Sequence, residues 1–96
     1  MKLRFTSEAE AELNQILDYY HTIDPVLAIR FLREVEKLRD RLLQFPESGH
    51  SRLAGRYRLA LVAGFPYALA YTATDKEILV EYLPHLKRRP HHWRKD

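Results

Sequence analysis

The spacing of apolar residues changes once along this 96-residue chain, near residue 46. Before that point they recur every three or four positions, the period of an amphipathic helix, and after it they alternate, as in a strand with one buried face. A chain of this length has room for a single core. The sequence therefore predicts one α+β domain over residues 1–96, in which an N-terminal helical hairpin packs on one face of a small antiparallel sheet.

Two start signals predict the helices of that hairpin. Ser7, followed three residues later by Glu10, is typical of a capping box. Asp24 before Pro25 supplies an N-cap oxygen and then a residue whose fixed φ suits the first helical position. The short connection between the two helices makes them antiparallel. The predicted helices cover residues 7–22 and 25–45.

Each predicted helix carries one apolar stripe at helical spacing. The polar residues between the stripe positions, such as Glu12 and Gln15 in the first helix, are expected to face away from the core. The stripes consist of Ala9, Leu13, Ile16, Leu17 and Tyr20 in the first helix and of Ala28, Phe31, Leu32, Val35, Leu38, Leu42 and Phe45 in the second.

The second half of the chain predicts an antiparallel meander after a polar loop that begins at Pro46. Tyr67, Leu69 and Tyr71 alternate on one face of a strand, which predicts that they pack in the core. The opening segment Lys2 to Phe5 also alternates and is a candidate fourth strand. The three predicted strands cover residues 56–63, 67–72 and 77–83.

Alternation also assigns side chains to the two faces of the predicted sheet. Arg56 and Arg58 lie on the side opposite Tyr57 and Leu59. If the tyrosine and the leucine pack beneath the helices, both arginines line the open face of the sheet. The alternative for Arg58 is an ordinary exposed position.

Positive charge is concentrated toward the C-terminus. Residues 1–48 contain 7 Lys/Arg and 9 Asp/Glu, a balance of −2, whereas residues 49–96 contain 9 and 4, a balance of +5. The densest part is the basic tail, residues 85–96, in which three histidines accompany Lys87, Arg88 and Arg89. Such a cluster attracts phosphate groups or acidic protein segments. The alternative is a solvated tail that only aids solubility.

Several classes of protein are excluded by composition. The chain has no cysteine, which removes disulfides, thiolate nucleophiles and sulfur-ligated metal sites and fits a reducing cytoplasm. Its apolar runs are only a few residues long, so we expect neither a membrane span nor a signal peptide. His91 and His92 do not predict a metal site, because no acidic residue before Asp96 helps to complete the ligand set. No cofactor is expected.

Six short motifs occur in order along nearly the whole chain. None is specific by itself, but together they resemble the RelE/ParE toxin superfamily of type II toxin–antitoxin systems. They are an N-terminal strand, a helical hairpin with Ala28-x-x-Phe31, Phe45-Pro46-x-x-Gly49, Tyr57-Arg58, Phe65-Pro66-Tyr67 with Tyr71, and His85-x-x-Arg88-Arg89-Pro90-x-x-Trp93.

The resemblance implies a small basic toxin encoded beside an antitoxin. The antitoxin, ParD-like or similar, usually has a DNA-binding fold, and its acidic and apolar C-terminal segment wraps the toxin and blocks it, so an oligomer with the antitoxin is expected. RelE-like members cleave messenger RNA in the ribosomal A site. ParE-like members bind DNA gyrase and trap it on cleaved DNA. The sequence does not indicate which residues bind the antitoxin.

The two activities need different residues. A metal-independent ribonuclease needs an acid or base and cations that stabilise the phosphorane. His85 and Arg58 are the candidate catalytic residues for that activity, since an unperturbed histidine titrates near the working pH. The alternative for the histidine is a structural role at a strand end after Pro84. The candidate target- or phosphate-binding residues are Arg56, Arg58, Lys87, Arg88 and Arg89.

The C-terminal ending favours the ParE-like branch, whose members catalyse no reaction themselves. RelE-like enzymes commonly carry a tyrosine close to the C-terminus, whereas here no tyrosine follows Tyr82. The last aromatic residue is Trp93, which we expect to pack against the domain. Members of the superfamily that use histidine keep the nuclease hypothesis open. A third hypothesis is an inactive module whose basic groove only docks an acidic peptide.

Overall fold

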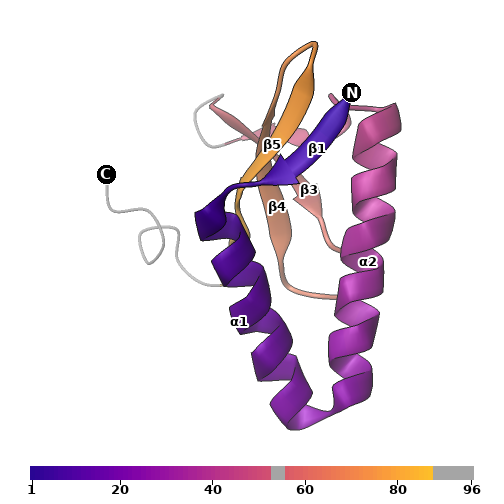
Figure 1. The fold of residues 1–96 in the computed structure, drawn as a ribbon, viewed down its shortest axis with the longest axis vertical. Coiled ribbons are helices and arrows are strands. Elements are labelled where there is room, and N and C mark those ends of the chain that lie inside the picture. Colours follow the sequence, from indigo (N-terminus) through magenta and orange to yellow (C-terminus); the bar gives the residue numbers. More distant parts are fainter. Residues whose placement is uncertain (53–55, 88–96) are drawn as a thin grey trace.

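The computed structural model describes residues 1–52 and 56–87 and confirms the α+β class. Figure 1 shows the two helices as an antiparallel hairpin that covers one face of the sheet. The elements are β1 (Lys2–Phe5), α1 (Ser7–Ile23), α2 (Pro25–Gln44), β2 (His50–Arg52), β3 (Tyr57–Leu61), β4 (Ala68–Ala73) and β5 (Glu77–Tyr82). No helix within the described ranges is long and apolar enough to cross a membrane.

The sheet has five strands in the order β1-β5-β4-β3-β2. The antiparallel meander of β3, β4 and β5 is confirmed. The sheet is mixed, however, because β1 pairs with β5 in parallel, with Leu3 opposite Ile78 and Phe5 opposite Val80. Side chains alternate with the same period in parallel and in antiparallel strands. The sequence pattern therefore could not predict the direction of this edge strand.

β2 lies inside the segment that we expected to be a polar loop. It pairs antiparallel with β3, and His50 lies opposite Leu59. An edge strand has a neighbour on one side only and needs no run of apolar residues, so its polar sequence gave no strand signal.

The helix start signals are correct for α2 and wrong by one residue for α1. Asp24 caps α2, because its Oδ1 accepts a hydrogen bond from the Val26 amide at 3.0 Å. Thr6, rather than Ser7, caps α1, and its hydroxyl accepts from the Ala9 amide at 3.0 Å. The threonine backbone is extended and donates to the Val80 carbonyl at 3.0 Å, so β1 continues directly into the cap.

The core lies between the hairpin and the sheet, with Phe31 near its centre. This ring is fully buried and packs against Tyr20, Phe65 and Tyr67, with centroid distances of 5.6, 5.0 and 5.7 Å. The expected packing of Leu69, Tyr67 and Tyr71 against this core is confirmed. Two predicted stripe residues of the second helix are exposed instead, namely Leu32 and Phe45. Phe45 lies just beyond the end of α2.

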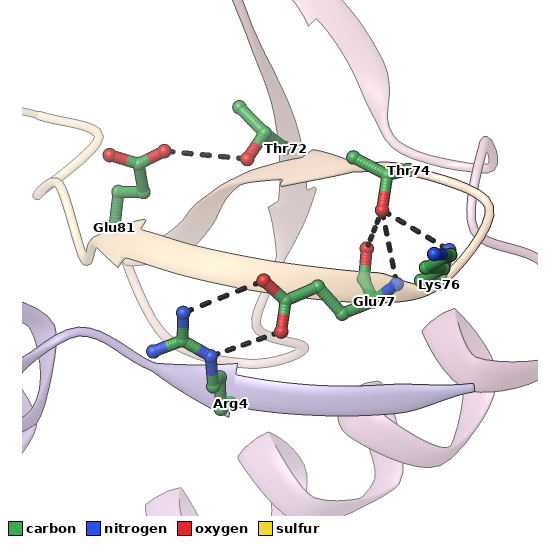
Figure 2. Close-up of polar contacts among 6 residues, drawn as sticks. All are labelled: Arg4, Thr72, Thr74, Lys76, Glu77 and Glu81. Carbon is green, nitrogen blue, oxygen red and sulfur yellow. Dashed lines mark hydrogen bonds and ion pairs between the residues drawn. The ribbon is translucent and has the colours of Figure 1, made fainter.

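Charged and polar side chains connect β1, β4 and β5 on the face of the sheet away from the helices (Figure 2). Arg4 on β1 forms an ion pair with Glu77 on β5, with Nε and Oε1 3.0 Å apart. Thr72 donates to Glu81 at 3.3 Å. The exposed ion pair contributes little stability. Both contacts match polar side chains of neighbouring strands.

Phe31→Ala should lower the free energy of unfolding by about 3–5 kcal/mol, because a fully buried ring leaves a cavity when it is removed. The matched control on the same helix is Ile29→Ala, since Ile29 is 52% exposed. That control should change stability by about 0.5 kcal/mol or less. Urea unfolding followed by circular dichroism measures both, and equal losses would contradict the assigned core.

Candidate functional site

Arg58 lies on the helix-covered face of the sheet, not on the open face. On β3, Ala60 and Val62 belong to the core under the helices, and Arg58 shares their side by alternation. The open-face prediction required Tyr57 and Leu59 to pack beneath the helices. They pack on the opposite face instead, so the prediction is wrong for Arg58. The sequence pattern separated Arg58 from Tyr57 and Leu59 correctly and left open which set met the helices. It was wrong for Arg56, which precedes β3 and whose guanidinium lies over the Tyr57 ring.

The Arg58 guanidinium holds the loop between α2 and β2. Its Nη1 donates to the backbone carbonyls of Glu47, at 3.1 Å, and Gly49, at 3.0 Å. The side chain is half-buried. Charge-assisted hydrogen bonds to two carbonyls give the arginine a structural role in joining the helical half of the chain to the sheet.

Tyr71 completes the attachment of this loop from inside the core. It lies opposite Arg58 in the β3–β4 register and is fully buried. Its hydroxyl donates to the Pro46 carbonyl at 2.8 Å and accepts from the Gly49 amide at 3.0 Å. A Cβ at Gly49 would stand 2.6 Å from the same hydroxyl, so the loop can approach this closely only because residue 49 has no side chain.

Two phenols of the core, the buried Tyr71 and the partly buried Tyr20, have raised pKa values. Burial raises the pKa of Tyr71 above its ordinary value of 10.0, and the Gly49 hydrogen bond and the Arg58 charge partly oppose this rise. Burial also raises the pKa of Tyr20, and the neighbouring Tyr67 and Tyr19 add to the rise. Both phenols therefore keep their protons to a higher pH in the folded chain than in the unfolded chain.

His85 lies just after β5, at the end of the sheet where β4 begins. It forms an isolated antiparallel bridge with Tyr67, and the two rings meet edge to face with centroids 4.9 Å apart. Its Nδ1 accepts a hydrogen bond from the Lys87 amide at 3.1 Å. In this bond Nδ1 acts as the acceptor and so carries no proton.

The structure does not bring the two candidate catalytic residues together. Arg58 pairs with Tyr71, whereas His85 pairs with Tyr67. Tyr67 and Tyr71 are four residue steps apart along extended chain, which is about 13 Å at a rise of roughly 3.3 Å per residue. Two groups that act on one phosphate must both lie within hydrogen-bond reach of it.

The open face of the sheet carries an aromatic patch. The rings of Tyr57 and Tyr82 meet edge to face with centroids 5.5 Å apart, and Ala68 and Ala70 lie beneath them. The Arg56 guanidinium lies over the Tyr57 ring at 5.8 Å from its centroid. Arg56 is thus the predicted target-binding residue that belongs to this patch.

The other predicted target-binding residues belong to the basic tail. Lys87 is exposed and follows His85 by two residues. Arg88 and Arg89 lie outside the described residues. Among residues 1–52 and 56–87, no group of three His, Cys, Asp or Glu side chains is arranged to hold a metal ion.

A groove lies between α1 and the chain that leaves β5, with a volume of about 520 Å³. Glu12 on α1 helps to hold its two walls together, because its Oε1 accepts a hydrogen bond from the Leu83 amide at 2.7 Å. The sequence pattern assigned this glutamate to the solvent-facing side, since helical spacing does not show that a strand end lies above it. The lining residues are Glu12, Gln15, Ile16, Tyr19, Tyr20, Pro66, Tyr67, Tyr82, Leu83, Pro84 and His85.

Comparisons with known proteins agree with this architecture. The model of the family described as ParE toxin of type II toxin–antitoxin system, parDE, matches residues 3–90. A solved chain described as belonging to the chromosomal ParDE toxin–antitoxin system from P. aeruginosa superposes with a TM-score of 0.79 at 21% sequence identity. The match covers 91% of this chain and 97% of that one. No curated protein matches the sequence.

Tyr71→Phe should lower the free energy of unfolding by about 1–3 kcal/mol, because it leaves the buried Gly49 amide without its acceptor. The matched control Tyr19→Phe removes the hydroxyl of a tyrosine that is 58% exposed. It should leave the free energy of unfolding nearly unchanged. Urea titrations of both variants compare the two losses. A neutral Tyr71→Phe would mean that the hydroxyl does not hold the loop.

The same variant has a pH signature. The unfolded phenol ionises near 10.0, below the raised folded value. The stability that the protonated Tyr71 contributes should therefore be fully present below pH 10 and be lost as the pH rises above it. Tyr71→Phe should make that fall shallower without removing it, because Tyr20 contributes in the same direction.

Proposed function

Because the chain belongs to the ParE toxin family of type II toxin–antitoxin systems, we propose that it inhibits growth by binding DNA gyrase and that a cognate antitoxin neutralises it. The proposed target and antitoxin place its action in the cytoplasm. In this proposal the chain catalyses no reaction, and its surface residues only make contacts. Arg56 and the tail residues Lys87, Arg88 and Arg89 provide the positive charge for the target.

The separation of Arg58 from His85 is the observation that favours binding to a target over RNA cleavage. A metal-independent nuclease needs its cation and its acid or base at the same phosphate. Here the arginine donates to the Glu47 and Gly49 carbonyls. Its partner Tyr71 lies four residue steps, about 13 Å, from Tyr67, the partner of His85. Arg58 is accordingly proposed to act on toxicity through the fold and not through contact with the target.

Two other functions remain as alternatives. A RelE-like ribonuclease would use His85 together with basic residues of the tail, and an inactive module would bind only the antitoxin. Gyrase supercoiling inhibition and cleavage of a ribosome-bound message distinguish the three hypotheses, since each predicts a different pair of results.

Expression of variants without the antitoxin gives the sharpest test of the proposed mechanism. His85→Ala should leave growth inhibition largely intact, because binding to gyrase requires no proton transfer. The triple change Lys87→Ala, Arg88→Ala and Arg89→Ala should abolish inhibition, because it removes the clustered charge. Growth curves and the supercoiling assay measure both effects.

Circular dichroism must show that each variant folds. A folded but harmless His85→Ala would favour the nuclease, because losing a general acid or base typically costs about 10² to 10⁴ in rate. If the triple variant were still fully toxic, these tail residues would not belong to the surface that binds the target. Arg58→Ala is not informative here, since it disturbs the loop after α2 under either mechanism.

Antitoxin binding should weaken as salt rises, because the C-terminal half carries a balance of +5 and an acidic segment is the proposed ligand. Exposed charges are screened over roughly 10 Å at 0.1 M salt. Titration calorimetry at about 0.05 and 0.5 M salt measures the change. An affinity that is the same at both concentrations would show that apolar contacts alone hold the complex.

A further inference from the structure

The outer surface of α2 carries a stripe of positive charge. Arg30, Arg33, Lys37 and Arg41 follow one another at intervals of three, four and four residues, so they share one side of the helix. All four are exposed, and the buried residues of α2 form a separate stripe. Figure 1 shows this helix along one side of the molecule. We call these four residues the α2 stripe.

The two helices differ in charge, and the carboxylates of α2 leave most of the stripe unpaired. α2 contains five Lys/Arg and three Asp/Glu, whereas α1 contains four Asp/Glu and no Lys or Arg. Glu34 pairs with Lys37, with Oε2 and Nζ 3.2 Å apart, and Asp40 pairs with Arg39, which lies outside the stripe. Glu36 directly precedes Lys37 and so lies about 100° away around the helix. Among residues 1–52 and 56–87, only one stripe cation is thus held by a carboxylate.

The three arginines of the stripe keep donors for a ligand. Within the described part of the chain, Arg33 and Arg41 make no hydrogen bond and no ion pair. The Arg30 guanidinium lies over the Phe65 ring, with its Cζ 5.9 Å from the ring centroid. A guanidinium that stacks on an aromatic face still has its N–H donors at the edge of its plane. Since arginine binds phosphate through two parallel hydrogen bonds, these side chains suit a partner that carries phosphate groups.

The surroundings of the stripe favour a nucleic-acid duplex over a protein segment or a single strand. No exposed large apolar residue of α2 follows Leu32, whereas a protein interface has an apolar or aromatic centre. Residues 33–44 also contain no aromatic residue, and surfaces that bind single strands use aromatic rings to stack the bases. A duplex requires neither feature, because its phosphates are exposed on its outside and supply most of the binding free energy.

The length of the stripe matches the charge spacing of a duplex. From Arg30 to Arg41 the helix rises by about 16 Å, at roughly 1.5 Å per residue. One strand of B-DNA carries a phosphate about every 3.4 Å along its axis, so about five phosphates lie within that length. Four cations fixed on one helix can therefore face a single segment of the backbone.

We propose that the α2 stripe binds the phosphate backbone of double-stranded DNA without reading its sequence. Contacts to phosphate hold a protein on the duplex and carry no sequence information directly. The affinity should therefore depend strongly on salt and hardly at all on sequence. The inference goes beyond the proposed binding to gyrase and does not depend on it, because it rests on the charge, exposure and spacing of four residues of α2.

Fluorescence anisotropy of a labelled DNA duplex, titrated with the full-length purified chain, measures this binding. The logarithm of the binding constant should fall with the logarithm of the salt concentration, by about 0.9 for each phosphate contact. The triple variant Arg33→Gln, Lys37→Gln and Arg41→Gln should bind at least about tenfold more weakly at about 0.05 M salt. Its salt slope should be smaller by about three, or one for each cation removed.

The matched control is the triple variant Lys2→Gln, Arg4→Gln and Lys76→Gln. It removes the same charge from three exposed residues of β1 and of the turn between β4 and β5. We expect it to bind the duplex nearly as well as the native chain and with the same salt slope. A second duplex of equal length and different sequence should bind equally well. Circular dichroism should show that both variants fold, since all six side chains are exposed.

Five results would overturn the proposal. No binding to the duplex would mean that the stripe is only solvated. Equal weakening in both triple variants would assign the binding to net charge. A loss caused by Lys87→Ala, Arg88→Ala and Arg89→Ala, with none caused by the α2 variant, would assign it to the tail. Tighter binding to single-stranded RNA of the same length would identify a single strand as the partner, and tighter binding to polyglutamate of equal charge would identify an acidic protein segment.

Discussion

The hydrogen bonds of the buried Tyr71 hydroxyl join the two halves of the fold. A phenol at the centre of the sheet must find hydrogen-bond partners inside the core, and it finds them in the Pro46 carbonyl and the Gly49 amide. Both partners belong to the segment where the helical half ends and the strands begin. Arg58 holds the same segment through two carbonyls. The helices therefore sit on the sheet at a position that one tyrosine, one arginine and one glycine define.

This arrangement places Arg56, Arg58 and His85 in three different surroundings. Arg58 is occupied on the helix-covered face, while Arg56 and the Tyr57–Tyr82 ring pair lie on the open face. His85 lies at the end of the sheet and packs against Tyr67. Arg58 and His85 are thus held by separate sets of contacts, and Arg56 is held by a third.

The face of the sheet on which Arg58 lies could not be predicted from the sequence. Alternation correctly put Arg58 with Ala60 and apart from Tyr57 and Leu59, because successive side chains point to opposite sides. Tyrosine and leucine look like core residues in any sequence, and here they form a second apolar cluster on the face that no helix covers. Glu12 shows the same limit, because its role depends on the Leu83 amide, 71 residues away.

The sequence by itself determined the α+β class, the hairpin, the antiparallel meander, the Asp24 cap and the family resemblance. Each of these depends on contacts between near neighbours or on the period of apolar residues, which are properties of a local segment. Tertiary structure alone decided the parallel pairing of β1, the edge strand β2, the face on which Arg58 lies and the distance between Arg58 and His85. These features arise from pairings between distant segments, and a one-residue change of register or a change of direction leaves the local pattern almost the same while it moves every side chain to a new neighbour.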